Sequence, residues 1–145
     1  TLGPGVARYT EIAISSAQIT ATASGNLGHA SGLPLVGAPG LGLVLEFLSA
    51  VLIYDYDTAA YEGGGNVTVN WGGGGAAVST LVSAANSLAA SADNITQLVP
   101  AIAAGNALSG NLGLQLVAAS AFTQPGTAAG VARVKISYRV HATGL

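Results

Sequence analysis

The stretch Arg133-Val-Lys-Ile-Ser-Tyr-Arg-Val140 alternates strictly between polar and apolar side chains. Successive side chains of a β-strand point to opposite faces, so this alternation predicts a strand with one buried face and one polar face. The predicted faces are Val134, Ile136, Tyr138 and Val140 on the buried side, and Arg133, Lys135, Ser137 and Arg139 on the polar side. This segment is the clearest indication that the chain folds as β-structure.

Shorter segments repeat the same alternation, at Ile12 to Ile14, Asn66 to Trp71 and Leu112 to Leu116. Glycine runs at Gly63 to Gly65 and Gly72 to Gly75 bracket one of them, and such a density of glycine is typical of tight turns. Turn signals recur at intervals of roughly 8 to 12 residues, as they do in β-sandwiches. We therefore predict one all-β domain over residues 1–145, a jelly roll or β-sandwich of about eight antiparallel strands.

Two segments depart from simple alternation. Leu43 to Tyr54 is apolar at nearly every position and follows the turn signal Ala38-Pro39-Gly40, which predicts a long strand covered on both faces. Glu46 interrupts it, and it is shorter than the roughly 20 residues of a membrane-spanning helix, so we expect no membrane partner. The Ala- and Ser-rich region that follows allows a short helix near Leu81 to Ala92 or two strands, near Ala77 to Val82 and Ile95 to Val99. We favour the strands.

Charged residues make up only 7% of the chain, against about 25% in typical soluble domains. A monomer needs charged surface to stay in solution, so this deficit predicts that much of the exterior is covered by other protein chains. Four cations and a net charge of -2 cannot neutralise a phosphate backbone, which excludes a nucleic-acid partner. The chain has no Met, which fits removal of an initiator before Thr1 and predicts synthesis in the cytoplasm.

The acidic residues Asp55, Asp57 and Glu62 lie close together in the sequence among three tyrosines, Tyr54, Tyr56 and Tyr61. Paired carboxylates suit a glycosidase or a Ca²⁺ site, but acidic strand ends are also common turn formers, and we favour a structural loop or subunit contact. The tyrosines suit either stacking on sugar rings or anchoring a protein interface. We predict no metal and no cofactor, and place Tyr54 and Tyr61 with the acidic residues in an interface.

Three of the four cations, Arg133, Lys135 and Arg139, share one face of one predicted strand. They form either a solvated face on an edge strand or a recognition face that meets the acidic residues of a neighbouring copy. Catalysis finds no support, because His29 and His141 have no partner at the spacing of a metal site or a nucleophile. The glycines between Gly37 and Gly42 precede a strand and not a helix, which excludes a dinucleotide-binding loop. We predict that the protein is not an enzyme.

Several pieces together resemble small jelly-roll proteins of tailed bacteriophages: Ile14-Ser-Ser-Ala-Gln-Ile19, Leu33-Pro-Leu-Val-Gly-Ala-Pro-Gly40, Leu43 through Tyr56, Thr58-Ala-Ala-Tyr61 and Val134-Lys-Ile-Ser-Tyr-Arg-Val140. The resemblance implies a decoration, or cement, protein on the outer surface of the virion capsid. It further implies a homotrimer that clamps neighbouring copies of the major capsid protein, with no catalytic residues. A tail or fibre component is the nearest alternative, and a carbohydrate-binding module is the alternative from another class.

The segment Thr1 to Tyr9 begins Thr-Leu-Gly-Pro-Gly, a composition typical of an extended arm. Such an arm would reach a neighbouring subunit and become ordered on binding it. We therefore predict an N-terminal arm over residues 1–9.

Overall fold

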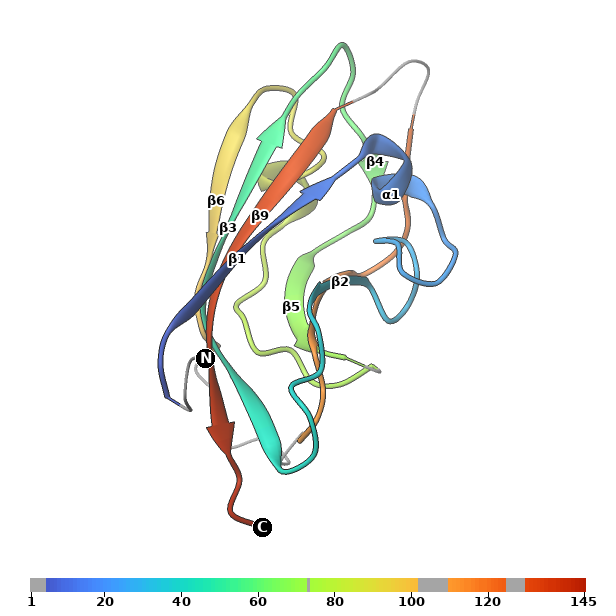
Figure 1. The fold of residues 1–145 in the computed structure, drawn as a ribbon. Helices are drawn as coiled ribbons and strands as arrows, with labels where there is room; N and C mark the ends of the chain where they lie inside the picture. The colour runs from blue at the N-terminus through green and yellow to red at the C-terminus, as the bar shows by residue number, and fades with distance from the viewer. Residues whose placement is uncertain (1–4, 73, 102–109, 125–129) are drawn as a thin grey trace.

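Two layers of antiparallel strands face each other in the computed structural model, which describes residues 5–72, 74–101, 110–124 and 130–145 (Figure 1). The larger layer has the order β1-β9-β3-β6. Its strands are β1 (Arg8–Ile14), β9 (Val131–Ala142), β3 (Leu43–Asp55) and β6 (Asn94–Leu98). The smaller layer has the order β2-β7-β5, made of β2 (Leu33–Val36), β7 (Leu114–Ala118) and β5 (Val67–Trp71).

Two shorter features complete the described architecture. A two-stranded ribbon joins β4 (Glu62–Gly63) to β8 (Phe122–Thr123), and every strand pair is antiparallel. The helices are α1 (Ser16–Thr20) and the single 3-10 turn η1 (Ala84–Asn86). Ser15 caps α1 by accepting the amide of Gln18, whose side chain bonds back to the Ser15 amide. The prediction of an all-β sandwich is confirmed.

The core lies between the two layers and follows the alternation of the sequence. In β9, Ala132, Val134, Ile136 and Val140 are buried, as the alternation predicts. Tyr138 is half-buried and packs against the same core. From the opposite layer, Val69, Leu114 and Leu116 are completely buried. Burial of these apolar side chains is the main stabilising contribution to the fold.

The long strand β3 corrects one expectation, because only one of its faces is closed. Leu45, Phe47, Ala50, Leu52 and Tyr54 are buried, while the side chains between them are half-buried or exposed. The change of parity occurs at a β-bulge between Phe47 and Ser49. The extra residue keeps apolar side chains pointing inward on both sides of the bulge. The apolar character of this strand therefore serves one core and leaves Val51 and Ile53 on an open face.

The Ala- and Ser-rich region contains one of the two predicted strands. β6 occupies Asn94–Leu98, within one residue of the expected limits, but the segment Ala77 to Val82 makes only isolated bridges with its neighbours. Ser79 explains part of the difference, since its hydroxyl accepts the Val69 amide and donates to the Thr80 carbonyl. Side-chain bonds of this kind compete with a regular backbone ladder.

The described part of the predicted N-terminal arm, residues 5–9, differs from the expectation. Arg8 and Tyr9 belong to β1, which pairs with β9 along its whole length. The Gly5 amide donates to the Val140 carbonyl at 2.7 Å, so the pairing with β9 begins even earlier. The described part of the predicted arm therefore lies against its own domain, and residues 1–4 lie outside the described residues.

Candidate interaction face

The outward face of the larger layer carries most of the charged residues that the sequence singled out. Arg133, Lys135 and Arg139 project from β9, which lies between β1 and β3. The alternative of a solvated edge strand is therefore wrong, because β9 is central and its backbone is paired on both sides. We call the outward side chains of β1, β9, β3 and β6 the outer face.

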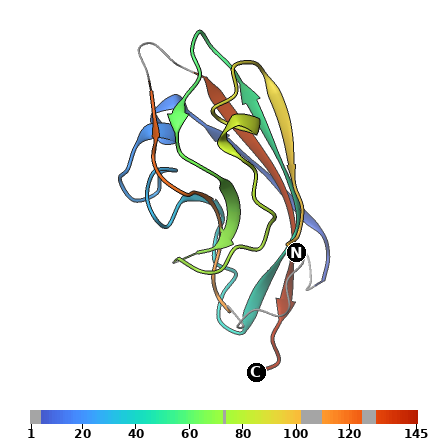
Figure 2. The same ribbon diagram turned by 180° about the vertical axis from the view of Figure 1, so that it is seen from behind.

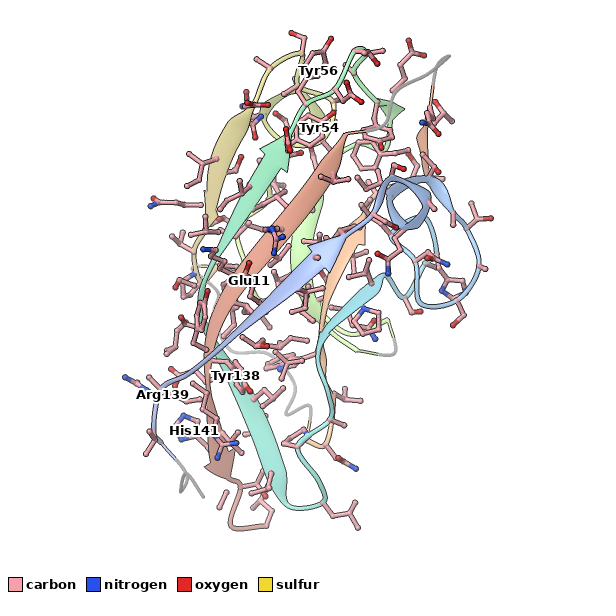
Figure 3. The ribbon with its side chains drawn as sticks, turned by 45° about the horizontal axis from the view of Figure 1, so that its top comes forward. Glu11, Tyr54, Tyr56, Tyr138, Arg139 and His141 are labelled. Atoms are coloured by element: carbon pink, nitrogen blue, oxygen red, sulfur yellow. The ribbon has the colours of Figure 1, made fainter. Side chains whose placement is uncertain are left out.

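Two glutamates on the neighbouring strands form ion pairs with two of these cations. Arg133 Nη1 lies 2.9 Å from Glu11 Oε1, and Arg139 Nη1 lies 3.7 Å from Glu46 Oε1. His141 Nε2 is 2.8 Å from the same Glu46 oxygen. Figure 3 labels Glu11, Arg139 and His141 on this layer. Glu46 and Arg139 face each other directly in the β3–β9 register, as Glu11 and Lys135 do between β1 and β9. Arg133 and Arg139 are thus paired with carboxylates of their own chain.

These ion pairs are exposed and contribute little to the stability of the fold. The paired side chains retain between 35% and 59% of their accessible surface, and exposed pairs of this kind contribute about 0.2 to 1 kcal/mol each. The sequence alone does not identify Glu11 and Glu46 as the partners of these cations. A strand neighbour is set by the sheet order, and nothing in the chain indicates that β9 lies between β1 and β3.

The acidic residues gather at one end of the sandwich, away from the C-terminus (Figure 1). Asp55 is the last residue of β3, Glu62 opens β4, and Asp57 lies in the connection between them, all three exposed. Asp93, which sequence analysis did not single out, accepts the Tyr56 amide at 2.9 Å. Within the described ranges, no three Asp, Glu, His or Cys side chains come close enough together to hold a metal ion.

The tyrosines of this region correct a second expectation. Tyr54 and Tyr61 each retain only 1% of their accessible surface, and their ring centroids lie 6.3 Å apart in the core. Tyr61 donates its hydroxyl to the Gly130 carbonyl at 2.6 Å. Both side chains therefore lie almost entirely inside the sandwich. Both tyrosines belong to the core and do not anchor an interface. Tyr54 points inward because it lies on the buried side of β3.

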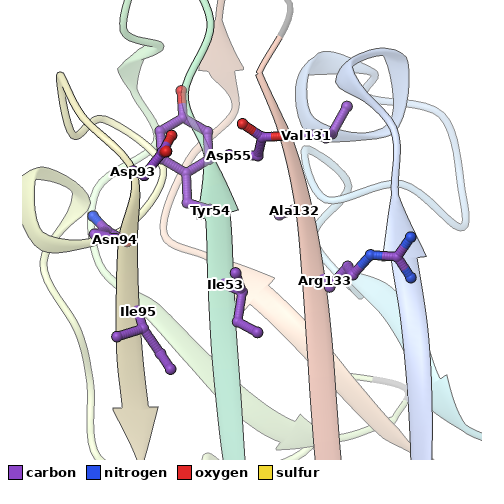
Figure 4. A pocket seen from close by; sticks show the side chains of 9 residues that line it. All are labelled: Ile53, Tyr54, Asp55, Asp93, Asn94, Ile95, Val131, Ala132 and Arg133. Carbon is purple, nitrogen blue, oxygen red and sulfur yellow. The ribbon is translucent and has the colours of Figure 1, made fainter.

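A shallow hollow marks the acidic end of the outer face. Figure 4 shows its lining, with Ile53, Ile95 and Val131 between the charged groups of Asp55, Asp93 and Arg133. Ile95 and Val131 retain 68% and 41% of their accessible surface, which is high for large apolar side chains. An apolar patch with charges around it is typical of a surface that contacts other proteins.

We predict that the folded protein loses stability at alkaline pH, because Tyr54 and Tyr61 are buried. Burial and the neighbouring Tyr61 raise the pKa of Tyr54 to about 12, and burial raises the pKa of Tyr61 as well. An unfolded tyrosine has a pKa of about 10, so above that pH the unfolded chain releases a proton that the folded chain retains. Stability is therefore complete below about pH 10 and falls as the pH rises towards about 12.

Urea unfolding between about pH 9 and about pH 11.5 measures this loss. We expect Tyr54→Phe to flatten the decline of the free energy of unfolding, because the variant has no phenol to ionise at that position. Tyr9→Phe is the control, since Tyr9 is 60% exposed. Equal slopes for the two variants would show that burial of Tyr54 does not cause the decline.

Comparison with protein families, with characterised proteins and with solved structures gives no significant match to this chain. Among the described residues, no helix is both long enough and apolar enough to cross a membrane. The fold and the outer face define the class of protein as an all-β sandwich with a broad sheet surface on which cations and carboxylates form exposed ion pairs.

Proposed function

We propose that this chain is a structural protein of a virus particle, a decoration protein that binds the outside of a bacteriophage capsid and stabilises contacts between major capsid proteins. The observation that carries the proposal is the outer face. It is large, nearly neutral and partly apolar in a chain with only 7% charged residues. A surface of this kind suits contact with other protein chains. The resemblance of the sequence to phage decoration proteins supplies the capsid as the partner.

Strand order supports the jelly-roll part of the proposal. When the bridged segment Ala77 to Val82 is counted beside β5, the layers have the orders β1-β9-β3-β6 and β2-β7-β5-(77–82). Neighbours within a layer are then mostly distant in sequence, and the chain crosses repeatedly between the layers. Two Greek keys combined in this way make up a jelly roll.

The sugar-binding alternative loses its main support, since Tyr54 and Tyr61 lie in the core. A homotrimer and a position on the head remain expectations from the resemblance. The test is a mass measurement in solution, with and without empty phage heads, together with co-sedimentation on heads and on isolated tails. We expect an oligomer that sediments with heads. A stable monomer that binds neither particle would overturn the proposal, and binding to tails alone would favour the tail component.

Charge reversal tests whether the outer face recognises a neighbour. We expect Arg133→Glu with Arg139→Glu to weaken assembly at low salt, because the complementary charges that guide protein association are then lost. The fold should survive, since each exposed pair contributes only about 1 kcal/mol or less. Sedimentation velocity at low and high salt measures the assembly.

The matched control exchanges the partners as well, adding Glu11→Arg and Glu46→Arg to the reversal. This variant restores the ion pairs within one chain but inverts their positions on the outer face. Continued loss of assembly would show that a neighbouring chain senses the charges. Full recovery would show that the charges act only within their own chain, and the recognition hypothesis would then be wrong.

A further inference from the structure

β6 is the outermost strand of the larger layer, at the left of Figure 1 and at the right of the reverse view in Figure 2. Among the strands that the structure describes, it pairs with β3 on one side only. An unpaired strand edge presents a row of backbone donors and acceptors to any chain that can pair with it. Whether another chain can pair with β6 depends on which of its backbone amides and carbonyls point outward and on which side chains protect them.

Hydrogen bonds elsewhere in the layer determine which groups of β6 point outward. The Thr143 amide donates to the Gly42 carbonyl at 2.9 Å, which makes these two residues a hydrogen-bonded pair of the β3–β9 ladder. Hydrogen-bonded pairs alternate along an antiparallel ladder. Beyond the bulge in β3, the hydrogen-bonded partners of β9 are therefore Ser49, Val51 and Ile53. The backbone groups of the residues between and after them, Ala50, Leu52 and Tyr54, point the other way, towards β6.

Asn94, Thr96 and Leu98 are the β6 residues opposite them, so the amides and carbonyls of Ile95 and Gln97 point away from β3. Val99, the next residue in this alternation, provides independent evidence for the same direction. Its carbonyl accepts the Thr80 amide at 2.8 Å, and Thr80 lies in the segment that is bonded to β5 in the other layer. In the described part of the chain, the outward groups of Ile95 and Gln97 have no such partner.

The side chains of Asn94 and Thr96 bond to the Ser87 and Asn86 carbonyls, but the outward backbone edge of β6 lacks the usual protection against pairing with another strand. Its sequence, Asn94-Ile-Thr-Gln-Leu98, contains neither charge nor proline. The other edges of the two layers differ, since β1 carries Arg8 and Glu11, β2 contains Pro34, and β5 is bridged by the segment Ala77 to Val82. Charges and prolines are the usual protection of an edge strand. β6 therefore stands out as the open, neutral edge.

We propose that two copies of this chain pair antiparallel through β6, with Thr96 on the two-fold axis. This register places Ile95 opposite Gln97 of the second copy, so the outward amides and carbonyls of both residues exchange hydrogen bonds on each side of the axis. A register centred on Gln97 would instead place Ile95 opposite Val99, whose backbone is already bonded to Thr80. Of these two registers, only the one centred on Thr96 pairs the open groups of Ile95 and Gln97 with each other.

Charge and space favour the same arrangement. Asp93 immediately precedes β6, and antiparallel pairing separates the two aspartates by six residues, or roughly 20 Å. This exceeds the Debye length of about 8 Å at physiological salt, whereas parallel pairing would place the two carboxylates side by side. A hollow between η1 and β6, lined by Ala85, Asn86 and the residues from Asn94 to Gln97, leaves room beside the edge. Pairing also shields part of Ile95, which is 68% exposed.

Cysteine cross-linking tests both the pairing and its register, since the chain contains no cysteine. Thr96 faces its own copy across the axis as a non-hydrogen-bonded pair, with an expected Cα separation of about 4.5 Å. We expect Thr96→Cys to form at least about tenfold more covalent dimer under mild oxidation than Ile95→Cys, whose two copies lie diagonally and beyond the geometry of a disulfide. Non-reducing electrophoresis measures the yield.

A third variant tests the pairing without any cross-link. Ile95→Lys adds a charge to an exposed edge position, so we expect the fold to survive and the dissociation constant of the pair to rise at least about tenfold. Circular dichroism checks the fold, and sedimentation equilibrium measures the dissociation. Equal cross-linking of Thr96→Cys and Ile95→Cys would overturn the inference. These measurements use no capsid, so failure to bind heads leaves the inference intact and overturns only the proposed function.

Discussion

Leu52→Ala is expected to lower the free energy of unfolding by about 2 to 5 kcal/mol. Leu52 is completely buried in the middle of β3, with β9 on one side and β6 on the other. Removing its side chain loses apolar burial and leaves a cavity that the paired strands cannot close. Since domains are typically stable by only about 5 to 15 kcal/mol, this single change removes a large share of the total.

Val51→Ala provides the control on the adjacent position of the same strand. Val51 lies on the outer face and is half-buried, so its truncation should cost less than about 1 kcal/mol. Urea denaturation of both variants measures the difference. Equal losses for the isolated chain would contradict the one-sided burial of β3. A loss at Val51 that appears only in the assembled protein would identify the outer face as a contact.

Gly32→Ala is the second substitution with a large expected effect, because two costs combine at one position. Gly32 has a φ of +77°, a region in which an L-residue is strained by about 1 to 2 kcal/mol. A Cβ atom there would also overlap the Leu116 carbonyl oxygen of β7 and crowd the Val117 side chain. Backbone of a paired strand cannot move aside, so overpacking adds about 1 to 3 kcal/mol or more.

Gly42→Ala separates the two costs. Gly42 has a nearly equal φ of +73°, but no atom lies within 4 Å of the position that its Cβ would occupy. We expect this variant to show the backbone strain alone, about 1 to 2 kcal/mol. Thermal unfolding of the pair measures both, and each kcal/mol corresponds to roughly 2 to 4 °C in Tm for a domain of this size. Equal losses of Tm for the two variants would contradict the close approach of Gly32 to β7.

Local patterns predicted the strands well where one side of a strand faces water. The alternation of Val134 to Val140 correctly gave both the strand and its buried face, because period-two patterning reflects the two sides of a sheet directly. β3 shows where this fails. Its outward side chains include Val51 and Ile53, so its sequence resembles a strand buried on both sides. An open apolar face cannot be distinguished from a covered one by composition.

The candidate site was predictable in its residue types and not in its arrangement. The cations of β9 do share one face, as the alternation requires, but their carboxylate partners come from strands distant in sequence. Glu11 lies 122 residues before Arg133. Glu46, which contacts both Arg139 and His141, lies 95 residues before His141. The tyrosines show the same limit. Tyr54 and Asp55 are adjacent in sequence, yet one is buried and the other exposed, because adjacent residues of a strand point in opposite directions.

The sequence by itself therefore determined the secondary-structure class of this protein, its single buried pattern along β9 and its shortage of charge. These properties are local or additive, so they can be deduced from neighbouring residues and from composition. Only the tertiary structure decided that β9 is central, that Glu11 and Glu46 pair with Arg133 and Arg139, and that β6 is left as an open, neutral edge. Each of these depends on which strands become neighbours, and strand order is set by the packing of residues distant in sequence.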